Sequence, residues 1–560
     1  MPASGSGPRV SRPELVLLAA LAVWAMFPIV LLLVHASQTH TIFTGADGLI
    51  GANGVLGADQ LQYLAWARDA GTHGLASDLF TLEPNGHVYL EPLFTITGAL
   101  WQIGLSLQLA YLLWKPLAVI ALFVAAVAWA RRAFGDQLGP RTAAAVLAVF
   151  LYTPLAALFS WLQLGAGSFR FELYLLGSEL LAANKLWGYV PSALALALVP
   201  VALLAVERAL DPQISVPGRL GAPYGARRPL SPFLGTGREP RVASRWPQRR
   251  WLAVAALGSL VASWLHPWQG ITLIVMFVGL ALWRRLHGAL ALAVPALGAA
   301  LPLGYYYLLS HTDSAWKLAS NLEVISRLPP LTLLAGFGPL VLIGIIGLRR
   351  PNGIVFEQLV LLWIGGCFVT YFVNDAFAPH ALQGLSFPFA VLAVRGWQRL
   401  RLPAVAGVAA VVLVTIPGLS YDARKMVKVT RSSTVQYYLP SSDEQALRWV
   451  NSSAPPGGIL APTPFAAVVP SQTGRAVWVG HGYWSQDYPA RSRQADILFA
   501  GHMRAAVAQE FVRSTHARLL ASDCRHDADL TRKLHPLLES VHRFGCATVY
   551  VVAPRRSASR

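Results

Sequence analysis

The sequence predicts an all-α polytopic membrane domain of about 11 transmembrane helices, followed by a C-terminal extracytoplasmic α/β domain. Hydrophobic residues make up 55% of the 560 residues and charged residues only 13%, and the mean hydropathy is +0.48. The apolar residues come in long runs rather than in short amphipathic patterns, and crossing a bilayer takes about 20 apolar residues. We therefore expect residues 1–418 to form a multi-pass membrane domain and residues 419–560 to form a second domain.

Eleven apolar segments are predicted to span the membrane. They are residues 15–35, 108–130, 142–163, 188–208, 251–265, 270–285, 288–309, 331–348, 356–374, 385–398 and 403–418. The first is too long for the hydrophobic region of a signal peptide, and no small-residue cleavage site follows it directly, so we expect it to anchor the chain. Residues 91–105 are also apolar, but counting them as a span would invert the charge pattern of all later loops. We expect them to form a helix that lies at the outer face or dips into it.

The net charge of +18 mainly orients the chain and does not indicate nucleic-acid binding. With a cytoplasmic N-terminus, the inner loops contain 20 basic residues, and the outer loops before residue 419 contain five. This excess on the inner side is the positive-inside rule. Residues 209–250 are rich in Pro, Gly and Arg and are predicted to be a disordered cytoplasmic loop. Eleven spans then place the C-terminus outside, and we expect a multi-pass protein of the plasma membrane.

The C-terminal residues 419–560 have shorter apolar runs and more turns than the membrane part. Strands are expected near 458–461, 476–479, 518–521 and 547–552, with helices near 490–514 and 527–538, which predicts a small α/β layer structure. Ser442 stands three residues before Gln445, a spacing that predicts a helix-capping box. Cys524 and Cys546 both lie in this outer region, where disulfides persist, and each adjoins an expected strand, so we predict that they are bonded.

The first outer loop, residues 36–107, is long and contains carboxylates and aromatic residues in the stretch GADQLQYLAWARDAG. Asp59 is the candidate general base; alternatively, its side chain caps the helix that follows it. Tyr63 and Trp66 are candidates for stacking on a ligand ring, although Trp66 also fits an interfacial aromatic belt. Glu91 is a candidate second carboxylate or substrate-binding group, or a metal ligand together with Asp59. No cofactor is certain, and a divalent cation stays open.

Four basic residues are candidates for binding an anionic group of a ligand: Lys115, Arg170, Lys185 and His266. Arginine binds phosphate oxygens in pairs and lysine acts as a point charge. Lys115 lies within the second span, where an ionisable residue suggests a function by default, with snorkelling to the outer interface as the alternative. His266 precedes Pro267, and its alternative role is to satisfy backbone groups at a turn between two spans.

This arrangement resembles the type-C glycosyltransferases (GT-C superfamily), polytopic membrane enzymes with a catalytic Asp in a long first outer loop. The matching residues are Asp59 in GADQLQYLAWARDAG and the segment YLEPLFTITGALWQIGLS, which looks like the family's Pro-led segment ending in Gly. The resemblance implies a polyprenyl-phosphate sugar donor, an extracytoplasmic acceptor, and Asp59 as the base that takes the acceptor's proton. Gln60 stands where several branches have a second acidic residue, which leaves the metal requirement open.

Three functions from different classes follow from these features. The first is an inverting membrane glycosyltransferase that moves a hexose or pentose from polyprenyl phosphate to an extracytoplasmic glycan, lipid or protein. The second is a transporter or flippase of lipid-linked sugars, which predicts inverted repeats and broken helices at the membrane midplane, and we find no repeated halves. The third is a non-catalytic cell-envelope assembly protein in which the C-terminal domain is the binding module.

Overall fold

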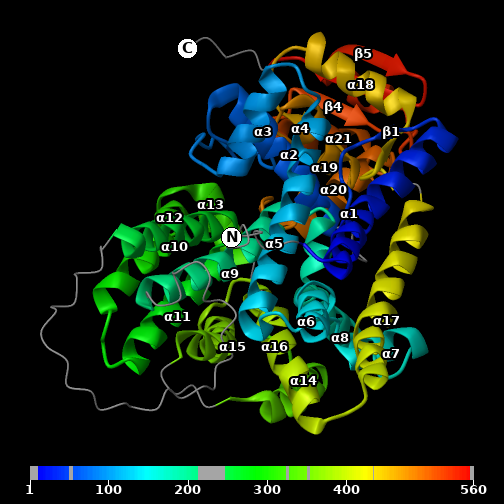
Figure 1. Cartoon of the computed structure of the whole chain (residues 1–560). Coiled ribbons are helices and arrows are strands. Elements are labelled where there is room, and N and C mark those ends of the chain that lie inside the picture. Colours follow the sequence, from blue (N-terminus) through cyan, green and yellow to red (C-terminus); the bar gives the residue numbers. More distant parts are fainter. Residues whose placement is uncertain are drawn as a thin grey trace, which may run out of the picture.

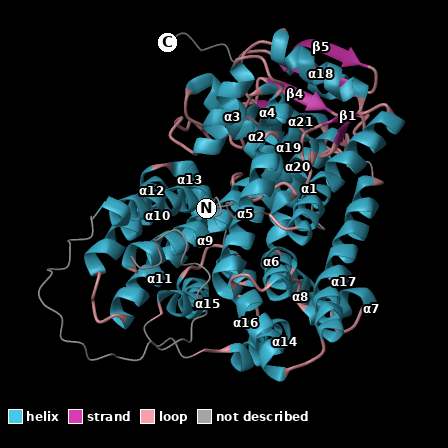
Figure 2. Cartoon of the chain, in the orientation of Figure 1, coloured by secondary structure: helices cyan, strands magenta, loops and turns pink. Residues whose placement is uncertain are grey.

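The computed structural model describes residues 10–49, 55–211, 246–322, 327–349, 354–432 and 434–554. Most of the predicted disordered loop 209–250 lies outside these residues. Helices dominate the described chain, and a small sheet lies at one end of the molecule (Figure 2).

Seven described helical units are long and apolar enough to cross a membrane. They are α1 (Arg12–Thr39), the unit Leu107–Phe134 made of α4 (Leu107–Leu112) and α5 (Trp114–Phe134), α9 (Val190–Leu210), α12 (Ala289–Thr312), α14 (Pro330–Gly347), α15 (Val355–Val373) and α17 (Ala404–Thr430). A bent pair, α6 (Leu138–Phe150) and α7 (Pro154–Leu162), meets at 53° and makes an eighth if it is one span. Pro154 explains the bend, because the residue before a proline disfavours helical backbone.

All eleven predicted spans fall on helices, but three of these helices do not pass as membrane spans by themselves. They are α10 (Trp246–Leu265), α11 (Pro267–Trp283) and α16 (Ser386–Leu400). At 1.5 Å per residue, the 17 residues of α11 and the 15 of α16 fall short of the roughly 30 Å hydrocarbon core. The structure therefore confirms a multi-pass membrane protein, and the count of eleven stays a prediction.

Helix α9 lies in the middle of the bundle, in contact with α5 and α10 (Figure 1). Of its most apolar 18-residue window, 83% is buried by protein, whereas the corresponding share for α17 is 11%. A central helix is thus enclosed by other helices, and α17 presents most of its surface outward. The residues just before α9 are consequently held by packing, which matters because Tyr189 is one of them.

Two helices of the first outer loop, α2 (Val55–His73) and α3 (Pro92–Gln102), pack closely against each other. The crossing needs glycine on both sides, because a Cβ built on Gly98 would lie 2.4 Å from the Ala67 carbonyl oxygen and 2.5 Å from the Gly71 nitrogen. Helix α3 covers most of the segment 91–105. With 11 residues it is about 16 Å long, too short to cross the membrane, as expected for a helix at the outer face.

The C-terminal segment contains a four-stranded sheet flanked by helices. Its elements are α18 (Ser441–Ser452), β3 (Ile459–Leu460), α19 (Phe465–Thr473), α20 (Tyr488–Phe499), α21 (Ala505–Thr515), β4 (Leu519–Ser522), α22 (Thr531–Leu534), β5 (Leu538–Phe544) and β6 (Ala547–Val552). The strand order is β3-β4-β6-β5; β3 and β4 are parallel and the other pairs antiparallel. The strand expected near 476–479 is only a single bridge, from Val477 to Ile459.

The structure contains the predicted disulfide between Cys524 and Cys546, whose Cα atoms are 4.8 Å apart. Cys524 follows β4, and Cys546 lies in the turn between β5 and β6. Because β4 and β6 run antiparallel, the end of β4 lies beside the start of β6, which brings the two cysteines together.

The first outer loop and the C-terminal segment are joined along several short contacts (Figure 1). Strand β1 (Ile42–Phe43) pairs antiparallel with β2 (Tyr438–Leu439). Further on, the Val477 amide donates to the Leu79 carbonyl oxygen at 2.9 Å, and Arg68 Nε donates to the Ser471 carbonyl oxygen at 2.9 Å. Two regions almost 400 residues apart in sequence therefore meet at one face of the helix bundle.

Candidate active site

Asp59 lies inside helix α2, four residues after the helix begins at Val55. The alternative that its side chain caps the helix is therefore wrong, because a cap precedes the first helical residue. The side chain is 20% exposed. His481 Nε2 lies 2.9 Å from Asp59 Oδ1, and the Tyr189 hydroxyl donates to Oδ2 at 3.3 Å. The structure thus places the predicted base between one residue of the membrane domain and one of the C-terminal segment.

His481 donates to Asp59 as a neutral imidazole. Its Nδ1 accepts a hydrogen bond from the Tyr483 amide at 3.1 Å, so the ring proton is on Nε2, the nitrogen that faces Asp59. Ser485 holds the loop in place: its hydroxyl accepts from the His481 amide at 3.2 Å and donates to the Phe80 carbonyl oxygen at 2.8 Å. Nothing in the local sequence around His481 indicates this role, because its partner is 422 positions away.

Tyr189 links Asp59 to a second polar cluster. The residue immediately precedes α9, and burial, together with the nearby carboxylates of Asp59 and Glu179, raises the pKa of its hydroxyl well above the usual value. The hydroxyl therefore keeps its proton and acts as a donor. Tyr63 packs edge-on against Tyr189 at 6.2 Å between ring centroids, which places this sequence-predicted stacking residue next to Asp59's partner.

The second cluster is centred on Glu179, near the end of α8 (Gly167–Leu180). Its carboxylate accepts from Lys185 Nζ at 3.0 Å and from Gln383 Nε2 at 2.6 Å, and His380 Nδ1 lies 3.1 Å away. Burial alone would raise the pKa of Glu179, but Lys185 and His380 outweigh that effect and hold it well below its usual range. Of these residues, the sequence singled out Lys185; Glu179, His380 and Gln383 were not assigned a role.

His266 lies beside this cluster, with its ring centroid 5.3 Å from that of His380. Burial, with the charges of His380 and Lys185, lowers its pKa well below the usual value, so the ring is neutral. The side chain does not cap α11, and its Nδ1 has no hydrogen-bond partner among the described residues. His266 therefore does not satisfy backbone groups at the turn between the two spans. It offers a neutral ring rather than a cation.

Lys115 is fully committed to protein partners. Its buried ammonium forms an ion pair with Asp47 and donates to the carbonyl oxygens of Leu186 at 2.7 Å and Ala25 at 3.2 Å. An ammonium has three donors, so none is left for a phosphate, and the side chain does not snorkel. Arg170 is half-buried on α8, donates to the carbonyl oxygens of Gln163 and Gly165, and lies outside the Glu179 cluster.

Glu91 is the N-cap of α3, where its Oε2 accepts from the Phe94 amide at 2.8 Å. Burial raises its pKa to about 8, so near neutral pH it holds a proton and is a poor base. Gln60, where other branches have an acidic residue, accepts from the backbone amides of Asp47 and Gly48. No group of three metal-ligating side chains in the described part of the chain contains Asp59 or Glu91.

Trp66 belongs to a closed aromatic cluster rather than to an open platform. It is 6% exposed, and its ring centroid lies 4.6 Å from Tyr89, 5.1 Å from Trp484 and 6.1 Å from Trp316. The cluster joins the first outer loop to the C-terminal segment and to α13 (Ser314–Leu322). Because Trp66 is buried on all sides, its role is packing. A position in the aromatic belt at the membrane interface is not needed to explain this residue.

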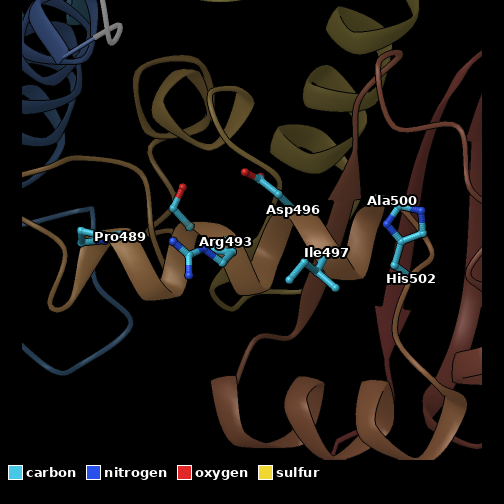
Figure 3. Close-up of a pocket in the computed structure, with 7 residues that line it drawn as sticks. Pro489, Arg493, Asp496, Ile497, Ala500 and His502 are labelled. Carbon is cyan, nitrogen blue, oxygen red and sulfur yellow. The ribbon is translucent and has the colours of Figure 1, made fainter.

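A groove with a volume of about 460 Å³ runs along α20 (Figure 3), and Asp59 is not among the residues that line it. It is lined by Pro489, Ser492, Arg493, Asp496, Ile497, Ala500 and His502. Its carboxylate, Asp496, accepts from both the amide and the hydroxyl of Thr463 at 2.8–2.9 Å. The groove is open and its acid already has partners, so we place the candidate site at Asp59.

No family model matches the chain, and no curated protein matches it. Among solved structures, the fold is similar to the apo oligosaccharyltransferase of Archaeoglobus fulgidus, with a TM-score of 0.51 and 12% identity over 93% of this chain and 71% of that one. ArnT from Cupriavidus metallidurans aligns over 97% of this chain and 99% of its own, with a TM-score of 0.48 and 13% identity. ArnT bound to undecaprenyl phosphate gives 0.49. At such identities the first similarity shows the fold alone, and the ArnT scores carry no further argument.

Proposed function

The chain has the fold of a polytopic type-C glycosyltransferase, and from that premise we propose that it transfers a sugar from a polyprenyl phosphate to an extracytoplasmic acceptor. The observation that carries the proposal is the Asp59 carboxylate, partly exposed and held by His481 and Tyr189. A fold alone does not fix a function, and the chemistry has to come from the site.

In this proposal Asp59 is the general base. Each carboxylate oxygen has two lone-pair positions, and His481 and Tyr189 occupy one position on each oxygen. A position therefore stays open to accept the proton of an acceptor hydroxyl while that oxygen attacks the sugar carbon and the bond to phosphate breaks. The two donors orient the carboxylate and stabilise its negative charge before the transfer. The proton that the carboxylate then takes up comes from the acceptor hydroxyl.

Lys185 is the proposed contact for the phosphate that leaves. The described chain provides one acceptor, Glu179, for its three N–H groups, in contrast to Lys115. A cation near the leaving phosphate stabilises the charge that develops there. Glu179 lies close enough to Tyr189 to affect its pKa, so the base and the cation belong to neighbouring clusters. Tyr63, beside Tyr189, is the proposed stacking contact for the sugar.

The proposed topology follows from the charge asymmetry of the loops. With eleven spans and a cytoplasmic N-terminus, residues 36–107 and the α/β segment of 419–560 face away from the cytoplasm, in the plasma membrane. Both halves of the Asp59 site then lie on the side where lipid-linked sugars meet their acceptors.

A transfer assay tests the proposal and separates its alternatives. The full chain would be reconstituted in liposomes with polyprenyl phosphates that carry a radiolabelled hexose or pentose, and with a cell-envelope extract as acceptor. We expect the label to leave the lipid fraction and polyprenyl phosphate to be released. Label that crosses the bilayer still attached to lipid would instead identify a flippase. If the label neither leaves any donor nor crosses the bilayer, neither reading holds.

A further inference from the structure

Outside the Asp59 site, three metal-ligating side chains converge on one point of the first outer loop: Asp69, His73 and His87. Asp69 and His73 are four residues apart on α2, so they share one face of the helix. His87 comes from the loop that follows. One ligand atom from each of the three lies within 4.8 Å of the other two. In the described chain this is the one group of its kind.

Both histidines turn the same ring nitrogen toward one carboxylate. His73 Nδ1 lies 2.8 Å from Asp69 Oδ1, and His87 Nδ1 lies 3.0 Å from Oδ2. The two rings stack with centroids 3.9 Å apart. The convergence of two Nδ1 atoms on one carboxylate is the arrangement that a shared ligand requires.

We propose that Asp69, His73 and His87 bind a divalent first-row metal ion, zinc first, as a site separate from the active site. Imidazole and carboxylate ligands suit Zn²⁺, and two histidines with one carboxylate leave a fourth position for water. Tetrahedral bonds of about 2.0–2.1 Å put ligand atoms roughly 3.3 Å apart, so the Nδ1–oxygen contacts at 2.8 and 3.0 Å lengthen by a few tenths of an ångström, and any wider separation within the 4.8 Å limit shortens. Binding requires both Nδ1 atoms to be without a proton, so each ring keeps one proton on Nε2 and releases any second proton to water; no redox step is involved.

The surroundings already have the features of a metal site. Asp69 is 3% exposed and is oriented by Ser77, whose amide and hydroxyl donate to Oδ2 at 2.6 and 2.8 Å. Outer contacts of this kind fix the geometry of a metal-bound carboxylate. The side chains of His73 and His87 are 46% and 38% exposed, which gives an ion a path in and their Nε2 protons a contact with water.

The ion would fasten the end of α2 to the loop 77–88. That loop is closed by an antiparallel bridge between Ala76 and Tyr89 and makes the contacts of Leu79 and Phe80 with the C-terminal segment. Phe80 contacts Ser485, which holds the loop that carries His481. The metal therefore acts as a structural support for the base. It lies ten residues from Asp59 along α2, or about 15 Å, so it is not a ligand of the reacting groups.

Zinc binding to the full chain tests the proposal without reference to activity. Protein purified with a tag that contains no histidine would be stripped with EDTA, titrated with Zn²⁺ by calorimetry and analysed for bound metal. We expect one Zn²⁺ per chain. At 100-fold excess over the dissociation constant, the melting temperature should rise by about 2 °C for a chain of this length.

The variants His73→Gln and His87→Gln should each weaken Zn²⁺ binding at least 100-fold, while the folded fraction without metal stays as in the wild type. His311→Gln is the matched control, because His311 is equally exposed and bonds only within its own helix. Asp59→Asn should leave binding unchanged. If the wild-type protein binds no Zn²⁺, the three side chains are held together by hydrogen bonds alone, and the proposal is wrong. Binding lost in Asp59→Asn but kept in both histidine variants would place the metal in the active site, and would overturn it too.

Discussion

The carboxylate of Asp59 is held by residues from two distant parts of the chain. His481 comes from a loop of the C-terminal segment and Tyr189 from the start of a membrane helix. Neither contact forms in a short peptide, because each needs the outer loop, the bundle and the C-terminal segment to be folded together. The base is therefore assembled by the fold rather than by a local motif.

His481→Gln should reduce kcat roughly 10- to 100-fold, because a hydrogen bond to a charged group is worth about 1.5–3 kcal/mol. KM should change little, since His481 orients the base and does not contact the substrate in our proposal. Melting curves would show that the fold is kept, and His502→Gln, an exposed histidine on the C-terminal segment, is the control. A loss of expression or of melting temperature equal to the loss of activity would assign His481 a merely structural role.

The stability of the protein should fall as the pH rises through the range where Glu91 ionises. Burial raises the pKa of Glu91 to about 8 in the folded chain, against an unfolded value near 4.5. The folded state thus binds more protons between these values, so the contribution of Glu91 to stability is largest below pH 4.5 and declines toward pH 8, by up to about 1.4 kcal/mol per pH unit. Urea unfolding at several pH values should show a smaller decline in Glu91→Gln; an unchanged slope would mean that Glu91 is ionised when folded.

Local sequence identified some site residues and could not identify others. Asp59 and the two bonded cysteines were found because each lies in a segment whose composition is informative by itself. His481 was missed because its partner is fixed only by tertiary structure. Lys115 illustrates the opposite error: an intramembrane lysine suggested a phosphate contact, but Asp47 and two carbonyl groups use all of its donors.

At the scale of elements, two helices of the first outer loop and the small C-terminal sheet decide the geometry. Helix α2 contains Asp59 and Asp69, and Glu91 caps the start of α3, which packs closely against α2. Elements with a regular spacing of apolar residues were predicted. Elements whose form depends on tertiary contacts were not. The expected helix near 527–538 contains only the short α22 and a 3₁₀ turn at His535–Leu537, and β5, a mostly half-buried edge strand, follows it.

The predicted capping box at the start of α18 does not form, because of the residue that precedes the helix. The helix begins at Ser441, directly after Pro440, and Ser442 makes no capping contact. Pro440 fixes the backbone so that the helix begins at Ser441, one position before Ser442. The Ser442–Gln445 spacing therefore has no role at the start of this helix.

Gly98→Ala should destabilise the protein by about 1–3 kcal/mol, because the new methyl group would contact the backbone of α2 at Ala67 and Gly71. Gly139→Ala, on α6, is the matched control: its Cβ meets nothing within 4 Å, and alanine is the better helix former by up to about 1 kcal/mol. Thermal unfolding in the same detergent compares the two. Equal effects would show that the α2–α3 contact is looser than the structure has it.

At the scale of the whole molecule, composition was sufficient to predict a multi-pass membrane protein. The fold was predicted from the family resemblance in the order of the segments along the chain. Each predicted span lies on a helix, yet three of those helices are too short or too polar to be counted by themselves. How short helices such as α11 and α16 meet the bilayer depends on their neighbours, and a linear sequence does not contain that information.

Labelling of single cysteines tests the proposed orientation. The wild type has no accessible thiol, because Cys367 is buried and the other two cysteines are bonded. A membrane-impermeant maleimide added to intact cells should label Pro84→Cys and Ser453→Cys, which are exposed in the first outer loop and in the C-terminal segment. It should label Asp136→Cys, exposed before α6, only after the cells are broken. Labelling of Asp136→Cys in intact cells would invert the topology and with it the proposed site.

The transfer rate of Asp59→Asn tests the central claim most directly. Asparagine keeps the size of the side chain and an oxygen that accepts from His481, and its amide group can donate to the Tyr189 hydroxyl oxygen, but it cannot take a proton. With the donor that the wild type uses, the account predicts a rate 10²- to 10⁴-fold lower at an unchanged melting temperature, the usual loss when a general base is removed. Asp136→Asn, an exposed carboxylate outside the site, should keep the wild-type rate. If Asp59→Asn retains more than about a tenth of the wild-type rate, Asp59 is not the base.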